Sequence, residues 1–326
     1  MRVARLYGAR DIRPVTEDDP VPQAGESLVE VTSVGVCGSD LHWFTEGAIG
    51  DAVLQRPLVL GHEMAGVIRG GDKDGTRVAI DPAIPCGVCE PCLDGNPNLC
   101  LNIVFAGHGG CDGGLRQLMA WPSHRLHPIP DAVTDDEGAL LEPLGVALHA
   151  YDLAHARLAT TVAVVGCGPI GLMLIQLARL AGATRVLAAD PLPHRMEAAV
   201  KLGAEPLAGA SGPAGEADLV FEVSGSEAAV EAALRAAKPG ARVILVGIPD
   251  GDRTSFPAAI ARRKGLTLVL SRRMGEVYPR AIDLAARRLI ELTPLVSAAF
   301  GLNEIQTALT TAAAREGLKI VVHPQA

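Results

Sequence analysis

Four cysteines lie close together within residues 86–100, in the spacing C-x2-C-x2-C-x7-C. The segment around them is rich in Pro, Gly and Asn and has few apolar side chains that would hold its shape. Four thiolates can bind one tetrahedral Zn²⁺ at about 2.3 Å, and such a closed site leaves no coordination position for chemistry. The spacing therefore predicts a structural zinc bound by Cys86, Cys89, Cys92 and Cys100.

A glycine-rich motif, Gly166-x-Gly168-x-x-Gly171, follows the apolar run 162–165 and precedes a helical pattern that begins near Pro169. In this context the first glycine permits a tight turn, the second lets a pyrophosphate approach the backbone, and the third lets helix and strand pack closely. The helix N-terminus then faces the phosphates. The motif predicts a dinucleotide site that includes Ile170, and the alternative is a tight turn without a ligand.

An acidic residue follows the next predicted strand, as the dinucleotide fingerprint requires. Asp190 lies about 20 residues after the glycines, where a carboxylate accepts hydrogen bonds from the ribose hydroxyls and repels a 2′-phosphate. This position favours NAD over NADP, although the nearby Arg195 could pair with that phosphate. A carboxylate that only caps a strand end or a helix is the alternative interpretation.

Two shorter segments carry further metal-ligand types. One reads Cys37-Gly-Ser39-Asp40-Leu-His42, and the other contains His62 followed by Glu63. A thiolate, an imidazole and a carboxylate are ligands that zinc accepts. Taken alone, each segment is more typical of a protein core or a turn than of a metal site.

The elements that position these residues change in character along the chain. Up to about residue 145 the sequence predicts short strands and turns, with strands at 28–36, 64–68 and 76–80. Beyond Pro143, apolar strands alternate with helices, which predicts a parallel sheet with right-handed crossovers. The expected strands are 162–165, 185–189, 218–223, 242–246 and 266–270; the expected helices follow Pro169, span 195–202 up to Gly203, and span 227–237 up to Pro239-Gly240; and 207–215 is expected to be a surface loop.

Composition excludes several classes of protein. The chain has 326 residues, 48% of them hydrophobic, which is enough for two domains. Its formal net charge is −8 and it has no basic run, so we expect no nucleic-acid partner. The N-terminus has no apolar secretory signal, so we expect a cytoplasmic protein with reduced cysteines. The uncharged stretch 158–178 contains a Gly-Pro turn, so we expect no membrane span.

Taken together, these motifs resemble the zinc-dependent medium-chain alcohol dehydrogenases along essentially the whole chain. The stretches CGSDLHWFTEG, RPLVLGHEMAG, LLEPLGVALHA and FEVSG are most similar to the polyol dehydrogenases, such as sorbitol and L-idonate 5-dehydrogenases. The resemblance implies an α/β fold with a GroES-like β catalytic domain, residues 1–145 completed by 283–326. It also implies a doubly wound Rossmann NAD-binding domain, residues 146–282, and a homotetramer or homodimer. Residues 318–322 should return to the first domain as a strand.

The resemblance also assigns catalytic roles. Cys37 and His62 become ligands of a second, catalytic zinc, and Glu63 and Glu142 compete for the third position. Asp40 is expected to accept a hydrogen bond from the His62 ring, and a carboxylate in a surface salt bridge is the alternative. Zinc lowers the pKa of a substrate hydroxyl, and a hydride passes to the nicotinamide. Ser39 and His42 are expected to relay the proton; a backbone-bonded turn serine and an exposed loop histidine are the alternatives.

Substrate contacts are implied at three positions. Trp43 follows the CGSD-x-H motif, where sorbitol dehydrogenases commonly have Tyr, and Phe105 is expected either to line the pocket or to belong to the core. Arg273 takes the place of a substrate-contacting Arg in the family. Arg272 and Met274 replace the usual aromatic residues, which puts sorbitol itself in doubt and suits a carboxylate such as an aldonic acid; a solvent-facing Arg is the alternative.

Other functions are also compatible with the sequence. Within the enzymes, L-threonine dehydrogenase and glucose dehydrogenase are the next candidates. An iron–sulfur carrier is disfavoured, because bacterial ferredoxins have three residues before the last cysteine and Pro after it, whereas here the gap is seven and Leu101 follows. A non-catalytic NAD-binding relative would usually lack a zinc ligand, and all four candidate ligands of the catalytic zinc are present.

Overall fold

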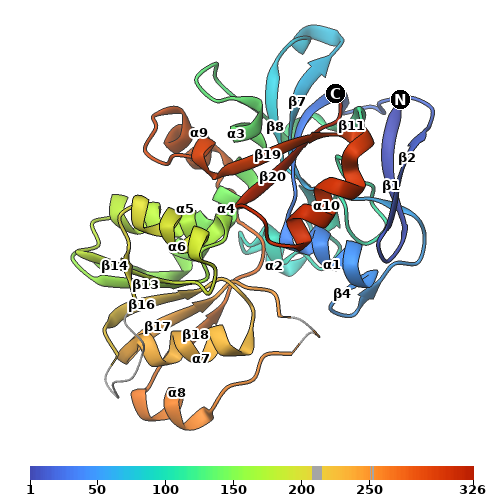
Figure 1. The fold of residues 1–326 in the computed structure, drawn as a ribbon. Helices are drawn as coiled ribbons and strands as arrows, with labels where there is room; N and C mark the ends of the chain where they lie inside the picture. The colour runs from blue at the N-terminus through green and yellow to red at the C-terminus, as the bar shows by residue number, and fades with distance from the viewer. Residues whose placement is uncertain (208–214, 250, 252) are drawn as a thin grey trace. The chain divides into compact units, whose positions relative to one another are not determined.

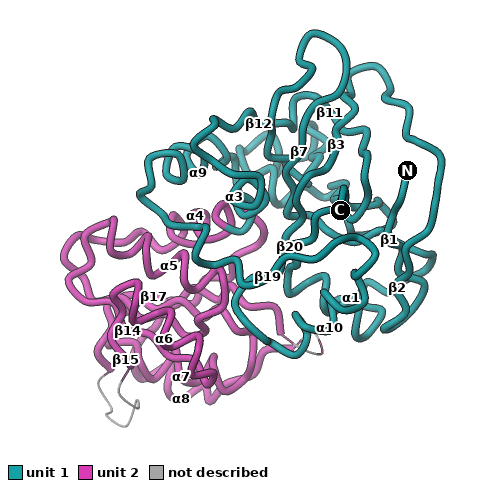
Figure 2. Tube along the Cα trace, turned by 45° about the horizontal axis from the view of Figure 1, so that its top comes forward, with its two compact units in different colours: residues 1–143, 275–326 teal, residues 144–274 magenta. Residues whose placement is uncertain are grey.

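The computed structural model describes residues 1–207, 215–249, 251 and 253–326. The chain divides into two compact units, residues 1–143 with 275–326 and residues 144–274 (Figure 2). The second boundary lies before the predicted residue 282. Tyr278 accounts for this position, because it is buried, stacks on His127 at 4.4 Å between ring centroids and donates to the Ile80 carbonyl, all within the first unit.

The first unit is built on a mixed β-sheet with the order β12-β8-β7-β3-β20-β19, and β11 also pairs with β3 (Figure 1). The C-terminal strand β20 pairs antiparallel with β3, so the predicted return of residues 318–322 to this domain is confirmed. The strands of this sheet are β3 (Glu26–Gly35), β7 (Glu63–Arg69), β8 (Arg77–Ile80), β11 (Leu118–Pro122), β12 (Leu126–Pro128), β19 (Val296–Gly301) and β20 (Lys319–His323).

Smaller elements surround this sheet. Helices begin at or next to several candidate site residues, in a region for which the sequence predicted short strands and turns. The small sheets contain β1 (Arg2–Gly8), β2 (Asp11–Thr16), β4 (Ala48–Ile49), β5 (Ala52–Val53), β6 (Leu58–Val59), β9 (Ala83–Ile84) and β10 (Val104–Phe105), and the helices are α1 (Gly38–Glu46), α2 (Glu90–Leu93), α3 (Asp135–Ala139), α4 (Leu141–Ala154), α9 (Tyr278–Ala286) and α10 (Ile305–Ala313).

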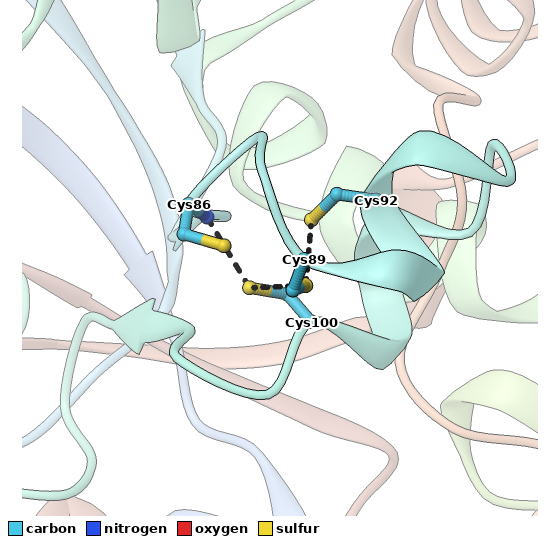
Figure 3. A group of neighbouring side chains, drawn as sticks. All are labelled: Cys86, Cys89, Cys92 and Cys100. Atoms are coloured by element: carbon cyan, nitrogen blue, oxygen red, sulfur yellow. Dashed lines mark hydrogen bonds between the residues drawn. The ribbon is translucent and has the colours of Figure 1, made fainter.

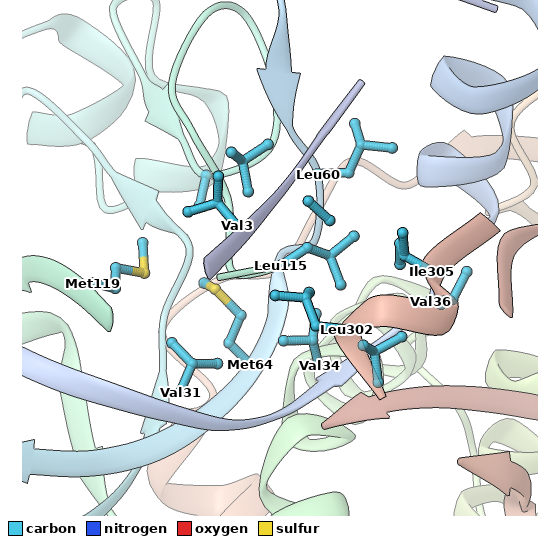
Figure 4. Close-up of a cluster of buried hydrophobic side chains, with 14 of the residues drawn as sticks. Val3, Val31, Val34, Val36, Leu60, Met64, Leu115, Met119, Leu302 and Ile305 are labelled. Atoms are coloured by element: carbon cyan, nitrogen blue, oxygen red, sulfur yellow. The ribbon is translucent and has the colours of Figure 1, made fainter. Parts of the chain in front are cut away.

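The core of the first unit joins segments that are far apart in the sequence. Val3, Val34, Met64 and Leu302 are almost fully buried in one cluster (Figure 4). Burying one such side chain contributes about 1.5–3 kcal/mol. This cluster includes residues of β3 and β7, and the candidate metal ligand Glu63 is the first residue of β7.

The second unit is a parallel sheet with the order β15-β14-β13-β16-β17-β18. Figure 1 shows α5 and α6 on one face and α7 and α8 on the other, as the doubly wound prediction requires. The elements are β13 (Thr161–Val165), α5 (Pro169–Leu180), β14 (Arg185–Ala189), α6 (Pro193–Lys201), β15 (Glu205–Pro206), β16 (Ala217–Glu222), α7 (Glu227–Ala236), β17 (Ala237–Leu245), α8 (Ala258–Lys264) and β18 (Thr267–Leu270).

One predicted boundary in this unit was wrong. Helix α7 ends at Ala236, and Pro239-Gly240 lies inside β17 instead of ending the helix. Ala237 already pairs with Ala217, and Gly240 has a φ of 78°, so the strand is interrupted by an irregular turn before it pairs again from Arg242. The predicted loop 207–215 lies largely outside the described residues. Among the described helices, none has the length and apolar character needed to cross a bilayer.

Candidate functional site

Three side chains from separate elements place potential metal ligands together. The Cys37 thiol, an imidazole nitrogen of His62 and a carboxylate oxygen of Glu63 lie within 4.8 Å of one another. Cys37 is the N-cap of α1, His62 lies in the short segment between β6 and β7, and Glu63 is the first residue of β7. This set of sulfur, nitrogen and oxygen donors fits Zn²⁺.

Asp40 holds the first two of these residues in position. Its carboxylate is buried and accepts hydrogen bonds from the Cys37 amide at 3.0 Å and the Gly61 amide at 3.1 Å. One oxygen also lies 3.4 Å from Nδ1 of His62. Such a contact fixes the ring orientation and leaves Nε2 as the metal-binding atom.

The electrostatics of this cluster favour a cation. Burial alone would lower the pKa of His62, but the negative charges of Asp40 and Cys37 raise it well above its usual value. The same ring lowers the pKa of Asp40 in spite of its burial. A zinc ion at the cluster would supply the positive charge that these groups attract.

Glu63 is held by a residue that our sequence analysis did not single out. Lys319 donates from Nζ to both carboxylate oxygens of Glu63, at 2.8 and 2.7 Å, and to the Val36 carbonyl at 2.9 Å. Gly35 makes room for this carboxylate, because a Cβ on Gly35 would lie 2.1 Å from Oε2 of Glu63. The sequence did contain a signal for this pair, because the apolar run LKIVV includes a lysine and lysine is rarely buried without a partner of opposite charge.

Glu142, the other candidate ligand, lies in the first turn of α4 and is 5% exposed. It is outside the 4.8 Å cluster, although its charge interacts with those of His62 and Glu63. Burial raises the pKa of Glu142 to about 7. It is therefore a buried carboxyl group whose ionised form needs a nearby cation.

This pKa predicts a pH dependence for the metal-free protein. The pKa of Glu142 is about 7 in the folded protein, above the usual value of 4.5. The protonated carboxyl group therefore stabilises the fold fully below about pH 4.5, and this stabilisation is lost as the pH rises through 7. Glu142→Gln removes this loss. Between pH 5 and pH 8, we expect the free energy of unfolding of the unsubstituted protein to fall by about 2–3 kcal/mol relative to the variant.

Denaturant titrations of both metal-free proteins at the two pH values measure this difference. Glu197→Gln, at an exposed position of α6, is the matched control and should follow the unsubstituted protein. Equal pH slopes for Glu142→Gln and the unsubstituted protein would contradict the assignment.

The four-cysteine segment forms a second cluster of ligands (Figure 3). The sulfurs of Cys86, Cys89, Cys92 and Cys100 lie within 4.8 Å of one another, with Cys89 at 3.4 Å from Cys92 and 3.8 Å from Cys100. Tetrahedral zinc with bonds of about 2.3 Å separates its sulfurs by about 3.8 Å. All four cysteines are free thiols. The arrangement therefore fits a closed zinc site.

Backbone amides favour the thiolate at two of these cysteines, whereas burial raises the pKa of Cys92 to about 12. Hydrogen bonds from the backbone of Val88 and Cys89 lower the pKa of Cys86 to about 6. A hydrogen bond from the Leu101 backbone likewise lowers the pKa of Cys89. Because zinc binds the thiolate, these bonds prepare the cluster for the metal.

The residues predicted to relay the proton and contact the substrate lie at different distances from the metal cluster. Oγ of Ser39 is 3.4 Å from Nε2 of His62, and His42 lies one turn further along α1, 3.4 Å from Glu46. The ring of Phe105 is 5.4 Å from that of His62. Trp43 is 3% exposed within the core cluster, with its ring edge-on to His108.

The glycine motif of the second unit forms a tight turn between β13 and α5. Gly166 has a φ of 101°, and a Cβ on Gly171 would lie 2.0 Å from the Gly166 carbonyl oxygen. A Cβ on Gly168 would meet only Arg195, at 3.7 Å, so space is open at the N-terminus of α5. Pro169 is the first helical residue, with Ile170 after it. This geometry suits a pyrophosphate.

Asp190 follows β14 and fixes this turn. Its two oxygens accept hydrogen bonds from the Cys167 amide at 2.7 Å and the Leu192 amide at 2.9 Å. An ionised carboxylate has about four acceptor positions, so each oxygen can still accept a ribose hydroxyl. Arg273, the predicted substrate contact, lies after β18 in this unit with a left-handed φ of 55°.

Profiles of known protein families match residues in both units. The profile of the alcohol dehydrogenase GroES-like domain matches residues 23–131, and that of the zinc-binding dehydrogenases matches residues 169–287. Sorbitol dehydrogenase of Bacillus subtilis is 32% identical over 99% of this chain and 97% of its own. The chain belongs to the zinc-dependent medium-chain alcohol dehydrogenases.

Solved structures of this family have the same fold. L-Idonate 5-dehydrogenase of Escherichia coli matches with a TM-score of 0.92 and 28% identity, over 99% of this chain and 97% of its own. 2R,3R-Butanediol dehydrogenase of Bacillus subtilis matches with a TM-score of 0.87 and 26% identity, over 99% of each chain. As a medium-chain alcohol dehydrogenase, the protein is an oxidoreductase that uses zinc and a nicotinamide cofactor.

Proposed function

We propose that this dehydrogenase oxidises a secondary alcohol of a polyol or sugar acid, of the sorbitol or L-idonate type, to a ketone with NAD. The observation that carries the proposal is the convergence of Cys37, His62 and Glu63 in a chain of this family. Three relatives are named for sorbitol, L-idonate and 2R,3R-butanediol, compounds with neighbouring secondary hydroxyls. Each chain binds two zinc ions, and the four-cysteine site is structural.

The residues around the first cluster prepare the substrate hydroxyl. When bound there, zinc would lower the pKa of that hydroxyl, and NAD would accept the hydride from its carbon. Asp40 fixes the His62 ring, so the metal-binding nitrogen keeps its orientation. Ser39, beside that nitrogen, would accept the hydroxyl proton while it releases its own proton, and His42 on the same helix would take up the released proton and pass it to solvent. Phe105 lines the apolar side of the substrate position.

Asp190 sets the preference for NAD. Its carboxylate remains able to accept hydrogen bonds from the ribose, and its charge would repel a 2′-phosphate. Asp190→Asn keeps one acceptor oxygen and removes the charge. We expect the KM for NAD to rise by about 10- to 150-fold and kcat/KM with NADP to increase, because loss of a charged hydrogen bond costs about 1.5–3 kcal/mol.

Initial rates with both cofactors measure this change. Asp218→Asn is the matched control, since Asp218 also accepts a backbone amide in the same unit, from Thr161 at 2.8 Å. We expect it to leave the ratio of NAD to NADP activity unchanged. A preserved NAD preference in Asp190→Asn would contradict the role of this carboxylate.

A substrate panel tests the proposed activity. The zinc-loaded protein is assayed for NADH formation with L-idonate, D-sorbitol, xylitol, galactitol and L-threonine. We expect turnover with a polyol or with the sugar acid. Turnover with L-threonine alone would assign the chain to the threonine dehydrogenases instead.

A further inference from the structure

Glu222 is a buried carboxylate of the second unit that the proposed mechanism does not use. It is the last residue of β16 and is only 1% exposed. One carboxylate oxygen accepts hydrogen bonds from the backbone amides of Ser224 and Gly225, both at 2.7 Å. Among the described residues, no cationic side chain pairs with it. Because a buried charge is costly unless it is hydrogen-bonded, these amides hold the carboxylate and the turn that follows it in one arrangement.

The backbone of Glu222 holds a second turn. Its carbonyl accepts hydrogen bonds from the amides of Val246 at 2.8 Å and Gly247 at 3.2 Å, just after β17. The two turns are in close contact, since a Cβ on Gly247 would lie 2.0 Å from the amide nitrogen of Gly225, which itself has a φ of 79°. Only glycine permits so close an approach. Glu222 therefore joins the turns after β16 and β17 through both its side chain and its backbone.

These turns lie where a doubly wound sheet binds its ligand. In the order β15-β14-β13-β16-β17-β18, successive strands run to one side from β13 and to the other side from β16. Ligands of such sheets bind at this switch point, outside the carboxyl ends of the strands. Glu222 pairs with Val165, the residue before the glycine motif, and a Cβ on Gly166 would lie 3.1 Å from the Ser224 amide nitrogen. The turn after β16 thus packs against the turn that suits the pyrophosphate.

The two halves of a dinucleotide extend to opposite sides of this switch point. Asp190 follows β14, on the side of the switch point that would bind the adenosine ribose. The turns after β16 and β17 lie on the other side. Because each half of a doubly wound sheet binds one mononucleotide, the turns that Glu222 joins are those available to the nicotinamide half.

We propose that Glu222 is a positioning residue that fixes the turns 223–226 and 246–248 for the nicotinamide half of the cofactor. This inference rests on the proposed function, because it takes Asp190 as the contact of the adenosine half. Glu222 is almost fully buried, so it acts through the two turns. Loss of its carboxylate should leave the adenosine half bound and loosen the nicotinamide half.

The binding of two nucleotides to the zinc-loaded protein tests this role without any assay of turnover. NADH contains both halves, whereas ADP-ribose lacks the nicotinamide ring, and isothermal titration calorimetry gives both dissociation constants. We expect Glu222→Ala to weaken NADH binding by at least about tenfold, because each hydrogen bond to a charged acceptor contributes about a factor of ten or more. The same substitution should weaken ADP-ribose binding by less than about threefold.

Glu222→Gln keeps an acceptor oxygen and nearly the same shape but removes the charge. Hydrogen bonds to a charged acceptor are about twice as strong as neutral ones, so we expect NADH binding to weaken by about threefold to tenfold, with ADP-ribose binding unchanged within about twofold. Asp218→Asn is the matched control, because Asp218 lies near the other end of β16 and also accepts a backbone amide, from Thr161. It should leave the ratio of the two dissociation constants unchanged.

This ratio of the NADH and ADP-ribose dissociation constants separates the outcomes. Equal weakening of both nucleotides by Glu222→Ala, which a general loss of stability would produce, would overturn the positioning role. An unchanged ratio in Glu222→Gln would also overturn it, and this comparison stands even if Glu222→Ala does not fold. An unsubstituted protein that binds neither nucleotide would instead contradict the proposed function.

Discussion

Replacing Cys37 with serine is expected to lower kcat/KM by about a thousandfold or more, while one zinc per chain remains at the four-cysteine site. Cys37 is the N-cap of α1 and its sulfur is one of three potential ligand atoms within 4.8 Å, so the substitution removes a proposed metal ligand without removing core volume. Polarisation of the substrate oxygen by a metal contributes several kcal/mol to the transition state, and each 1.4 kcal/mol is about a factor of ten.

The rate and the zinc content are measured on the same preparation. Cys111→Ser is the matched control, because Cys111 is a partly buried cysteine outside both ligand clusters. It should keep two zinc ions and near-normal activity. Unchanged activity in Cys37→Ser after loss of one zinc would show that the cluster is not the catalytic centre.

Replacing Cys89 with serine is expected to open the segment 86–100 while the remainder of the first unit stays folded. Zinc supplies on the order of 10 kcal/mol to comparable sites. This segment has little apolar packing of its own, and Val88, Leu93 and Leu101 are each more than 70% exposed. We expect proteolytic cleavage within 86–100 to become at least about a hundredfold faster.

Limited proteolysis with mass spectrometry locates the cleavage, and circular dichroism follows the remaining fold. The core cluster around Val34 and Met64 does not depend on this segment, so the far-ultraviolet spectrum should change little. Adding a chelator to the unsubstituted protein should reproduce the cleavage pattern. Protection that persists after loss of this zinc would contradict its structural role.

The nucleotide unit could be predicted closely because its signals are local. The apolar run before Gly166, the glycines and the helix after Pro169 follow one another directly, and each is stabilised by near neighbours in the sequence. The end of α7 at Ala236 was missed because β17 begins to pair with β16 before Pro239, and this pairing overrides the turn signal of Pro-Gly. Sheet pairing of this kind depends on residues that are distant in the sequence.

The first unit was less predictable, for the same reason. The ligand types at Cys37, His62 and Glu63 were found from motifs and family resemblance, but the helix that starts at Gly38 has no strong apolar period. The pairing of Glu63 with Lys319 spans 256 residues and depends on β20 returning to β3. No local pattern carries that information, so the third ligand could not be assigned from the sequence.

The transfer of deuterium from substrate to cofactor is the most direct test of the central claim. The zinc-loaded protein is incubated with NAD and either sorbitol or L-idonate deuterated at every carbinol carbon, and the reduced cofactor is analysed by mass spectrometry and NMR. We predict NADH carrying one deuterium at C4 of the nicotinamide, together with a ketone product. Reduced cofactor without deuterium, or no reduction with either substrate by protein that holds both zinc ions, would contradict the account.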